Sequence, residues 1–210
     1  MKKLFDYDGY FNQVLTKIMY LVSANLLFVL CSIPVITIGA SQAAMHTVLM
    51  RYYQGDEPDI LKTFFQAFKE NFRKSTSVWL AMLALAGTLI LNFYFLYRLN
   101  SSGTNPALVL LYLILFIWLV CWVYFYPVLC YYDNSWFGYA GFIARISIAE
   151  LPRTVLLIVT ALVPVLLCLF LAQYSSFGIM LLALGGFSVP AYISEGILLK
   201  MFQHYEEKSL

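Results

Sequence analysis

Residues 24–74 decide the fold, and they read ANLLFVLCSIPVITIGASQAAMHTVLMRYYQGDEPDILKTFFQAFKENFRK. The stretch begins with an apolar run that Pro34 ends or kinks, because proline has no amide hydrogen and clashes with the preceding turn of a helix. A weaker hydrophobic segment follows at 35–53, and then a charged amphipathic segment at about 58–74. This order predicts a hairpin of two membrane helices that continues into a helix on the membrane surface.

The composition of the whole chain agrees with a membrane location. Hydrophobic residues make up 62% of the 210 residues and charged residues only 11%, with a mean hydropathy of +0.79. Soluble domains average roughly 45–50% apolar and about 25% charged residues. The lipid bilayer is therefore the expected surrounding. A net charge of +2 offers no basic face, so we expect no nucleic acid as a partner.

The hydrophobic pattern predicts an all-α, polytopic protein with a single membrane domain over 1–210. A helix needs about 20 apolar residues to cross a bilayer, and six segments meet or approach that length. One or two interfacial amphipathic helices are expected on the cytoplasmic side, at about 58–74 and 137–151. The six expected spans are about 14–33, 35–53, 77–97, 107–130, 154–172 and 177–199, the last interrupted by Gly185, Gly186 and Pro190.

The positions of the basic residues predict the orientation. If the N-terminus is cytoplasmic and six spans follow, all 13 Lys and Arg residues except Arg98 fall on the cytoplasmic side. Cytoplasmic loops of membrane proteins carry an excess of Lys and Arg. We therefore expect both termini in the cytoplasm.

Two surfaces are candidates for contact with a partner. Small residues on the second predicted span, among them Gly39 and Ala43, allow helix backbones to approach closely in lipid. The segment 58–74 places apolar side chains at spacings of three and four, with polar and charged residues on the other side. Its candidate contact residues are Phe64, Phe68 and Phe72.

The two halves of the chain share a weak pattern. A shift of 79 residues superposes Tyr52-Tyr53 on Tyr131-Tyr132, and Lys74-Ser75 on Arg153-Thr154. In both halves a span ends in a tyrosine pair, a connecting helix follows, and a basic-hydroxyl pair opens the next span. One interpretation is a weak internal duplication with parallel repeats; the other is chance in a tyrosine-rich sequence.

Polar side chains inside the predicted spans are the candidate functional residues, because such groups are costly in lipid. Glu195 could be an ion or proton ligand, but we favour an interfacial carboxylate that water, Arg51 or Arg145 satisfies. His46 and Gln42 lie one helical turn apart, and a lone histidine more often bonds to a neighbouring helix than holds a ligand. The candidate intramembrane polar residues are Asn25, Thr37, Gln42, His46 and Glu195.

No motif in the chain names a reaction. HExxH, GxSxG, P-loop and GxGxxG patterns are absent from the sequence. The four cysteines lie in apolar runs, without a CxxC pair or a histidine at ligand spacing, which is typical of packing residues. We expect no catalytic, cofactor-binding or metal-binding residues, no cofactor and no enzyme activity, and we keep a membrane enzyme as a minor alternative.

Several motifs follow one another along the chain. Asn25 comes first, then the Pro-Val-Ile-Thr-Ile-Gly run at 34–39 and the phenylalanine-rich segment at 64–72. The Tyr-Pro pair at 126–127 and the Leu-Pro-Arg-Thr run at 151–154 come later. These motifs, in this order, resemble those of the YesL-like family of bacterial integral membrane proteins. The resemblance implies a multi-pass protein of the bacterial cell membrane and assigns no residue a catalytic role, because the function of that family is unknown.

The resemblance also implies a biological setting. Genes of YesL-like proteins usually lie beside those of sugar-binding proteins, permease subunits and glycoside-degrading enzymes. This implies a non-enzymatic accessory or regulatory protein of oligosaccharide uptake, whose partners are permease subunits of a sugar transporter or further copies of itself. This expectation rests on the association between neighbouring genes and not on any residue of the chain. The alternative is a small oligomeric transporter or channel, with the second span and the region of Glu195 lining its path.

Overall fold

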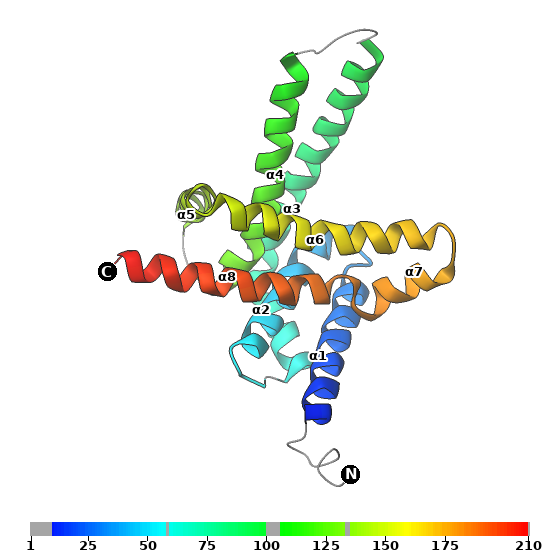
Figure 1. The fold of residues 1–210 in the computed structure, drawn as a ribbon, viewed down its shortest axis with the longest axis vertical. Helices are drawn as coiled ribbons and strands as arrows, with labels where there is room; N and C mark the ends of the chain where they lie inside the picture. Colours follow the sequence, from blue (N-terminus) through cyan, green and yellow to red (C-terminus); the bar gives the residue numbers. More distant parts are fainter. Residues whose placement is uncertain (1–9, 58, 100–105, 133–134, 210) are drawn as a thin grey trace.

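The computed structural model describes residues 10–57, 59–99, 106–132 and 135–209, and these form helices and short connections without a strand (Figure 1). The all-α prediction is confirmed. Two short segments lie between longer helices, the 3-10 turn η2 (Val35–Thr37) and the π-helical segment η3 (Leu182–Gly186). The helices are α1 (Tyr10–Cys31), α2 (Ile38–Tyr53), α3 (Ile60–Leu99), α4 (Pro106–Tyr131), α5 (Trp136–Ala149), α6 (Leu151–Ala172), α7 (Ser176–Leu181) and α8 (Ser188–Ser209).

Among the residues that the structure describes, five helical stretches are long and apolar enough to cross a membrane, by length and composition. They are α1, α3, α4, α6 and the stretch from α7 to α8. The helix at the second predicted span, α2, has 16 residues, or about 24 Å at 1.5 Å per residue. That is shorter than the roughly 30 Å hydrocarbon core of a bilayer. The structure thus supports a multi-pass membrane protein, with five helices of spanning length where the sequence predicts six.

The short helix α2 lies at the centre of the molecule and contacts α1, α3, α4 and α8. Small residues permit this close packing. A Cβ atom added to Gly39 would lie 2.6 Å from the carbonyl oxygen of Ser75 and 2.7 Å from Cβ of Trp79, both in α3. Protein therefore surrounds α2, as its polar sequence predicts. Its buried residues are Gly39, Ala40, Ser41, Ala43, Ala44, Met45, His46, Val48, Leu49 and Met50.

The expected division between a surface helix at 58–74 and a span at 77–97 is wrong. A single 40-residue helix, α3, covers both. The segment 74–77 reads Lys-Ser-Thr-Ser and contains neither glycine nor proline to end a helix. Ser75 and Thr76 are also buried, with Ser75 beside Gly39 of α2. The helix continues through this point because α2 packs against it there.

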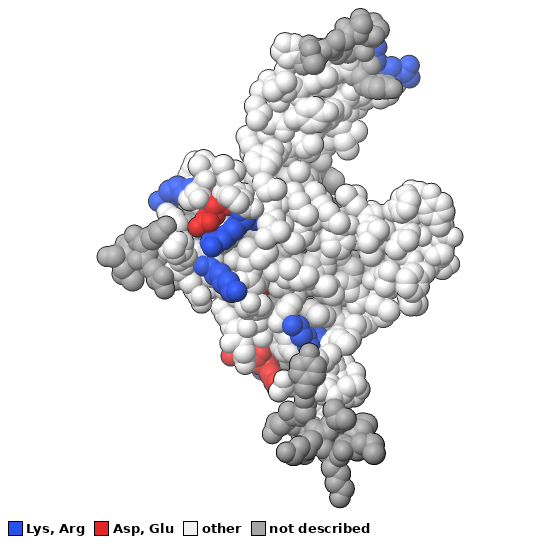
Figure 2. All heavy atoms as spheres, viewed as in Figure 1, with Lys and Arg blue, Asp and Glu red and all other residues white. Residues whose placement is uncertain are grey.

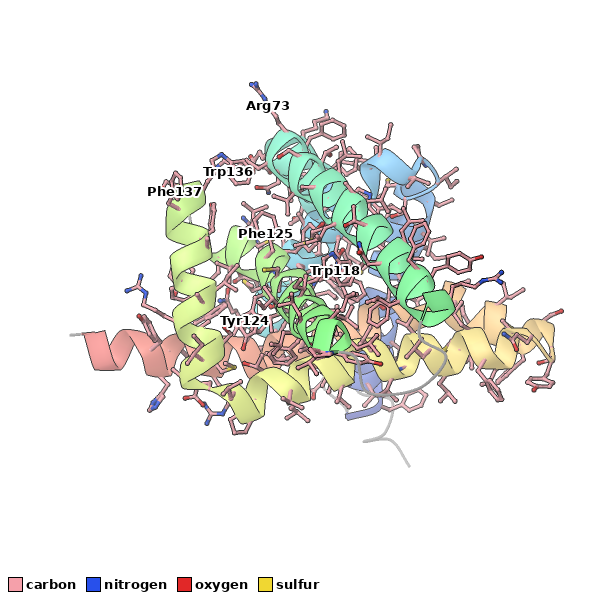
Figure 3. The ribbon with its side chains drawn as sticks, turned by 90° about the horizontal axis from the view of Figure 1, so that it is seen from above. Arg73, Trp118, Tyr124, Phe125, Trp136 and Phe137 are labelled. Carbon is pink, nitrogen blue, oxygen red and sulfur yellow. The ribbon has the colours of Figure 1, made fainter. Side chains whose placement is uncertain are left out.

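The long helices form two pairs that cross each other, α3 with α4 and α6 with the α7–α8 stretch. Figures 1 and 3 show that the hairpin of α3 and α4 extends from the centre in one direction, and that α6 and the α7–α8 stretch extend crosswise to it. The expected count of six spans is not confirmed. The helix predicted at 137–151 does occur as a separate element, α5, and the capping residue Glu150 separates it from α6.

The two halves of the chain differ at the position where the duplication predicts the same feature. Lys74-Ser75 lies inside the uninterrupted helix α3. Arg153-Thr154 follows a break at Glu150 and lies in the first turn of α6. The tyrosine pairs do occupy matching places, at the ends of α2 and α4.

Candidate functional site

An acid and a histidine meet in the interior between α2 and α8. Nδ1 of His46 lies 2.5 Å from Oε1 of Glu195. Glu195 has no exposed surface and His46 is 6% exposed. A buried carboxylate is very unfavourable without a partner, whereas a hydrogen-bonded pair is tolerated. His46 makes an interhelical bond of the kind that the sequence predicts, and this bond allows Glu195 to occupy the core.

The predicted basic partners of Glu195 are wrong. The side chains of Arg51 and Arg145 are exposed, and Nε of Arg145 donates a hydrogen bond to the carbonyl oxygen of Gly141 in its own helix. Glu195 is in the core instead of at an interface, because α8 packs directly on α2. Sequence spacing does not reveal the pairing, since 149 positions separate Glu195 from His46.

A thiol joins α4 to the same part of α2. Sγ of Cys130 donates a hydrogen bond to the carbonyl oxygen of Ala43, and the two atoms are 3.2 Å apart. Oγ1 of Thr47 lies 3.2 Å from the same sulfur. The sequence identifies Cys130 only as a packing residue. The structure adds a hydrogen-bonding role, one helical turn from His46.

Asn25 of α1 holds together the break in the last membrane segment. Its Nδ2 donates to the carbonyl oxygens of Leu182 and Ala183, at 2.8 and 2.7 Å. Its Oδ1 accepts from the amides of Phe187 and Ser188, at 3.0 and 3.1 Å. One side chain thus bonds to backbone groups at both ends of the π-helical segment η3. The predicted interruption of this span is confirmed, and Asn25 has a structural role there.

The remaining two candidate polar residues lie in different surroundings. Oγ1 of Thr37 donates within the bend between α1 and α2, where it lies 2.6 Å from the carbonyl oxygen of Cys31 and 2.7 Å from that of Pro34. Gln42, by contrast, lines an internal cavity, and His46 lines it too. The structure therefore brings Gln42, His46 and Glu195 into one region, and leaves Asn25 and Thr37 at separate bonding sites.

That cavity has a volume of about 460 Å³ and lies among α1, α2, α3, α4, α6 and α8. Ligand sites usually measure roughly 300–1,000 Å³ and combine apolar walls with a few polar groups. Apart from four polar residues, the lining is apolar or aromatic, with Phe28, Met45, Trp79, Trp122 and Phe187 contributing the largest side chains. The polar residues are Ser32, Gln42, His46 and Ser194.

Several aromatic residues of α4 lie near the centre of the molecule. Figure 3 shows Trp118, Tyr124 and Phe125 near the centre, and Trp136 and Phe137 on the outlying helix α5. Nε1 of Trp118 donates to the carbonyl oxygen of Met82 in α3, at 3.0 Å. These contacts fix α4 against its neighbours. Trp122 and Val123 of the same helix line the cavity.

A second hollow, of about 650 Å³, lies at the N-terminal part of α1 and has a polar lining. Asp56 and Glu57 lie on one side and Lys17 on another. The Nζ of Lys17 is 4.4 Å from the centre of the Tyr192 ring, a distance suited to a cation–π contact. Sequence reasoning did not anticipate this cluster, because its members come from three separate segments.

Part of the predicted interaction surface is not accessible. Gly39, Ala43 and Phe64 are buried inside the chain, where the small residues of α2 admit α3. Phe68 is half-buried, whereas Phe72 is 40% exposed. The small-residue face therefore packs within the chain, and only the outer side of α3 stays free among the predicted positions.

Residues 21–93 of the chain match the model of a family described as "Protein of unknown function, DUF624". No curated protein and no solved structure matches the chain. The matched segment runs from α1 through α2 into α3 and includes Asn25, Gln42 and His46. The helix that carries Glu195 lies outside it.

Proposed function

We propose that this chain is a non-enzymatic accessory or regulatory protein of the bacterial cell membrane that serves oligosaccharide uptake. The observation that carries a non-enzymatic role is the use made of its buried polar groups. Asn25 and the pair of His46 and Glu195 are buried and bond to other parts of the same chain, and the partly exposed Thr37 does the same. Groups engaged in this way hold helices together. The link with carbohydrate rests on the resemblance to YesL-like proteins.

A six-crossing topology with both termini in the cytoplasm belongs to this proposal. It takes α2 as the sixth crossing, which its burial among other helices supports. Figure 2 shows charged side chains gathered beside α5, α8 and the base of α1, with a separate basic group at the free end of the α3–α4 hairpin. Arg98 lies in the last turn of α3, at that end. This separation supports the charge-based orientation.

Cysteine labelling tests the topology, in a background without the four native cysteines. Ser102→Cys, in the segment between α3 and α4 that lies outside the described residues, is expected to react with an impermeant maleimide added to intact cells. Gln66→Cys, on the exposed side of α3, is expected to stay unlabelled until the cells are opened. Labelling of Gln66→Cys from outside would refute the proposed orientation.

The proposed partner surface is the outer side of α3. Leu61 is 59% exposed and Phe65 is 43% exposed, and Lys62 and Lys69 flank them on the same helix with exposed side chains. Exposed apolar groups beside basic ones suit either a lipid headgroup region or a protein partner with acidic residues. Permease subunits of a sugar transporter, or a second copy of this chain, are the proposed partners.

A second candidate function is a small oligomeric transporter or channel. The cavity favours it, because Gln42 and His46 line an internal space beside the buried Glu195. In known transporters, interrupted helices frame substrate sites. The α7–η3–α8 stretch of this chain is a helix interrupted in this way.

One set of measurements distinguishes the two functions. Deletion of the gene should reduce oligosaccharide uptake, and mild cross-linking in native membranes should recover a permease subunit with the tagged protein. Purified protein in vesicles should then move no solute by itself. If the vesicles instead show flux that Glu195→Gln changes, the transporter is correct. If deletion leaves uptake unchanged and the protein is recovered alone, the accessory role is wrong.

A further inference from the structure

We propose that the cavity beside His46 binds an uncharged amphiphile that has one apolar chain and a terminal hydroxyl group. This inference concerns a ligand of the chain itself. It depends on neither of the two functions proposed above. The walls, the polar groups and the neighbouring acid each limit what can bind.

The walls favour an apolar chain. Phe28, Val165 and Phe187 come from three different parts of the sequence and converge on the same space. Transfer of apolar surface from water to such walls contributes roughly 25 cal/mol per Å². Ile33 also lines the cavity and is 75% exposed at the surface. The cavity therefore reaches the outside of the molecule beside Ile33, where a chain from the surrounding lipid can enter.

The histidine favours a hydroxyl. Nδ1 of His46 is engaged with Glu195, so Nε2 is the ring nitrogen left for a ligand. That nitrogen donates a hydrogen bond when the imidazole is charged, and it can accept one when the ring is neutral and its proton is on Nδ1. A hydroxyl both donates and accepts, so it can bond with His46 in either state. Glu195 fixes the orientation of the ring and thus the direction of this bond.

Further polar atoms in the lining lack partners. The indole Nε1 of Trp122 and Oγ of Ser32 are buried, and each has no hydrogen-bond partner among the described residues. Both residues line the cavity. A buried donor without a partner is unfavourable, so a ligand oxygen would relieve this cost. By contrast, Nε1 of Trp79 already donates to the carbonyl oxygen of Val35, at 2.7 Å.

The lining disfavours a charged headgroup. Among the described residues it contains no Lys, Arg, Asp or Glu, and a charge on His46 would already be paired with Glu195. An anionic or cationic group would therefore be buried without a free counter-ion from the wall. An anion would also approach the carboxylate of Glu195 behind His46. A fatty acid or a phosphorylated lipid therefore fits the cavity less well than the corresponding alcohol.

Tryptophan quenching tests the inference, because Trp79 and Trp122 line the cavity. Trp118→Phe and Trp136→Phe remove the other two tryptophans. The protein, in detergent micelles, is titrated with oleyl alcohol brominated across its double bond. Bromine quenches an indole on contact, so we expect saturable quenching. Two controls carry the same two bromines: the fatty acid, and a hydrocarbon without the hydroxyl. Each should bind about tenfold more weakly than the alcohol, the equivalent of about one hydrogen bond in a buried site.

Matched variants on α6 distinguish the cavity from the outer surface. Ala161→Phe and Val165→Phe each place a ring in the cavity and should abolish the saturable component. Val159→Phe is the control, because Val159 is 46% exposed on the same helix and does not line the cavity. It should leave quenching unchanged. Circular dichroism and gel filtration verify that each variant is folded.

Three results would overturn the inference. The first is quenching that rises without saturation, which would report only partition into the micelle. The second is saturable quenching that persists in both folded cavity variants. The third is binding of the fatty acid at least as tight as that of the alcohol.

Discussion

Asn25→Leu is expected to lower the free energy of unfolding by about 3 kcal/mol or more. The substitution keeps the approximate size of the side chain but removes four hydrogen bonds at once. Single interhelical hydrogen bonds in membranes contribute about 0.6 kcal/mol on average and up to about 1.7. Backbone groups buried without partners cost about 1–3 kcal/mol each. Four lost bonds around one side chain therefore exceed the usual effect of a single substitution.

The measurement is the unfolding equilibrium in mixed micelles, with increasing sodium dodecyl sulfate and detection by circular dichroism. Asn92→Leu in α3 is the matched control. Asn92 is exposed, and its Nδ2 donates to one carbonyl oxygen in its own helix, that of Thr88. Its replacement should change stability by less than about 0.5 kcal/mol. Equal effects at Asn25 and Asn92 would contradict the bonding role assigned to Asn25.

His46→Leu is expected to destabilise the protein by about 3–5 kcal/mol, because it leaves the fully buried Glu195 without its partner. Replacement of both residues, in His46→Leu/Glu195→Met, should restore a large part of that loss. Well-packed apolar residues often substitute for a buried ion pair at little or no cost. The double variant should therefore be more stable than His46→Leu alone.

The same unfolding titration measures this coupling. The surface pair of Glu150 and Arg153 is the control, with 3.3 Å between Oε2 and Nη1 and with both side chains partly exposed. Glu150→Gln should cost less than about 1 kcal/mol. If the effects of His46→Leu and Glu195→Met were simply additive, the two side chains would not be coupled, and the pair would not be the bond that joins α2 to α8.

The sequence predicts the long apolar helices well. The spans expected at 107–130 and 154–172 correspond to α4 and α6 within three residues at each end. The interruption near Gly185 and Gly186 is also confirmed, in the π-helical segment η3. Both features depend on local sequence. The length of an apolar run predicts the length of a membrane helix, and the positions of glycine and proline predict where that helix is interrupted.

The missed features have other physical causes. A surface helix and a membrane helix share the same 3.6-residue period. The hydrophobic pattern therefore cannot show whether 58–74 and 77–97 form two helices or the single helix α3. The pairing of His46 with Glu195, and of Asn25 with η3, depends on how distant helices pack. Sequence patterns place each of these polar residues inside a hydrophobic segment but do not identify its partner.

The position of Asn25 has a consequence for the order of assembly. Its four bonds reach residues 157 to 163 positions later in the chain. At roughly 5–20 residues per second, a ribosome needs on the order of ten seconds to synthesise that interval. Throughout it, α1 carries an amide side chain whose final partners do not yet exist. The helix α1 therefore cannot complete its hydrogen bonds until residues 182–188 have been synthesised and have packed against it. The beginning of the chain reaches its native state only when the end does.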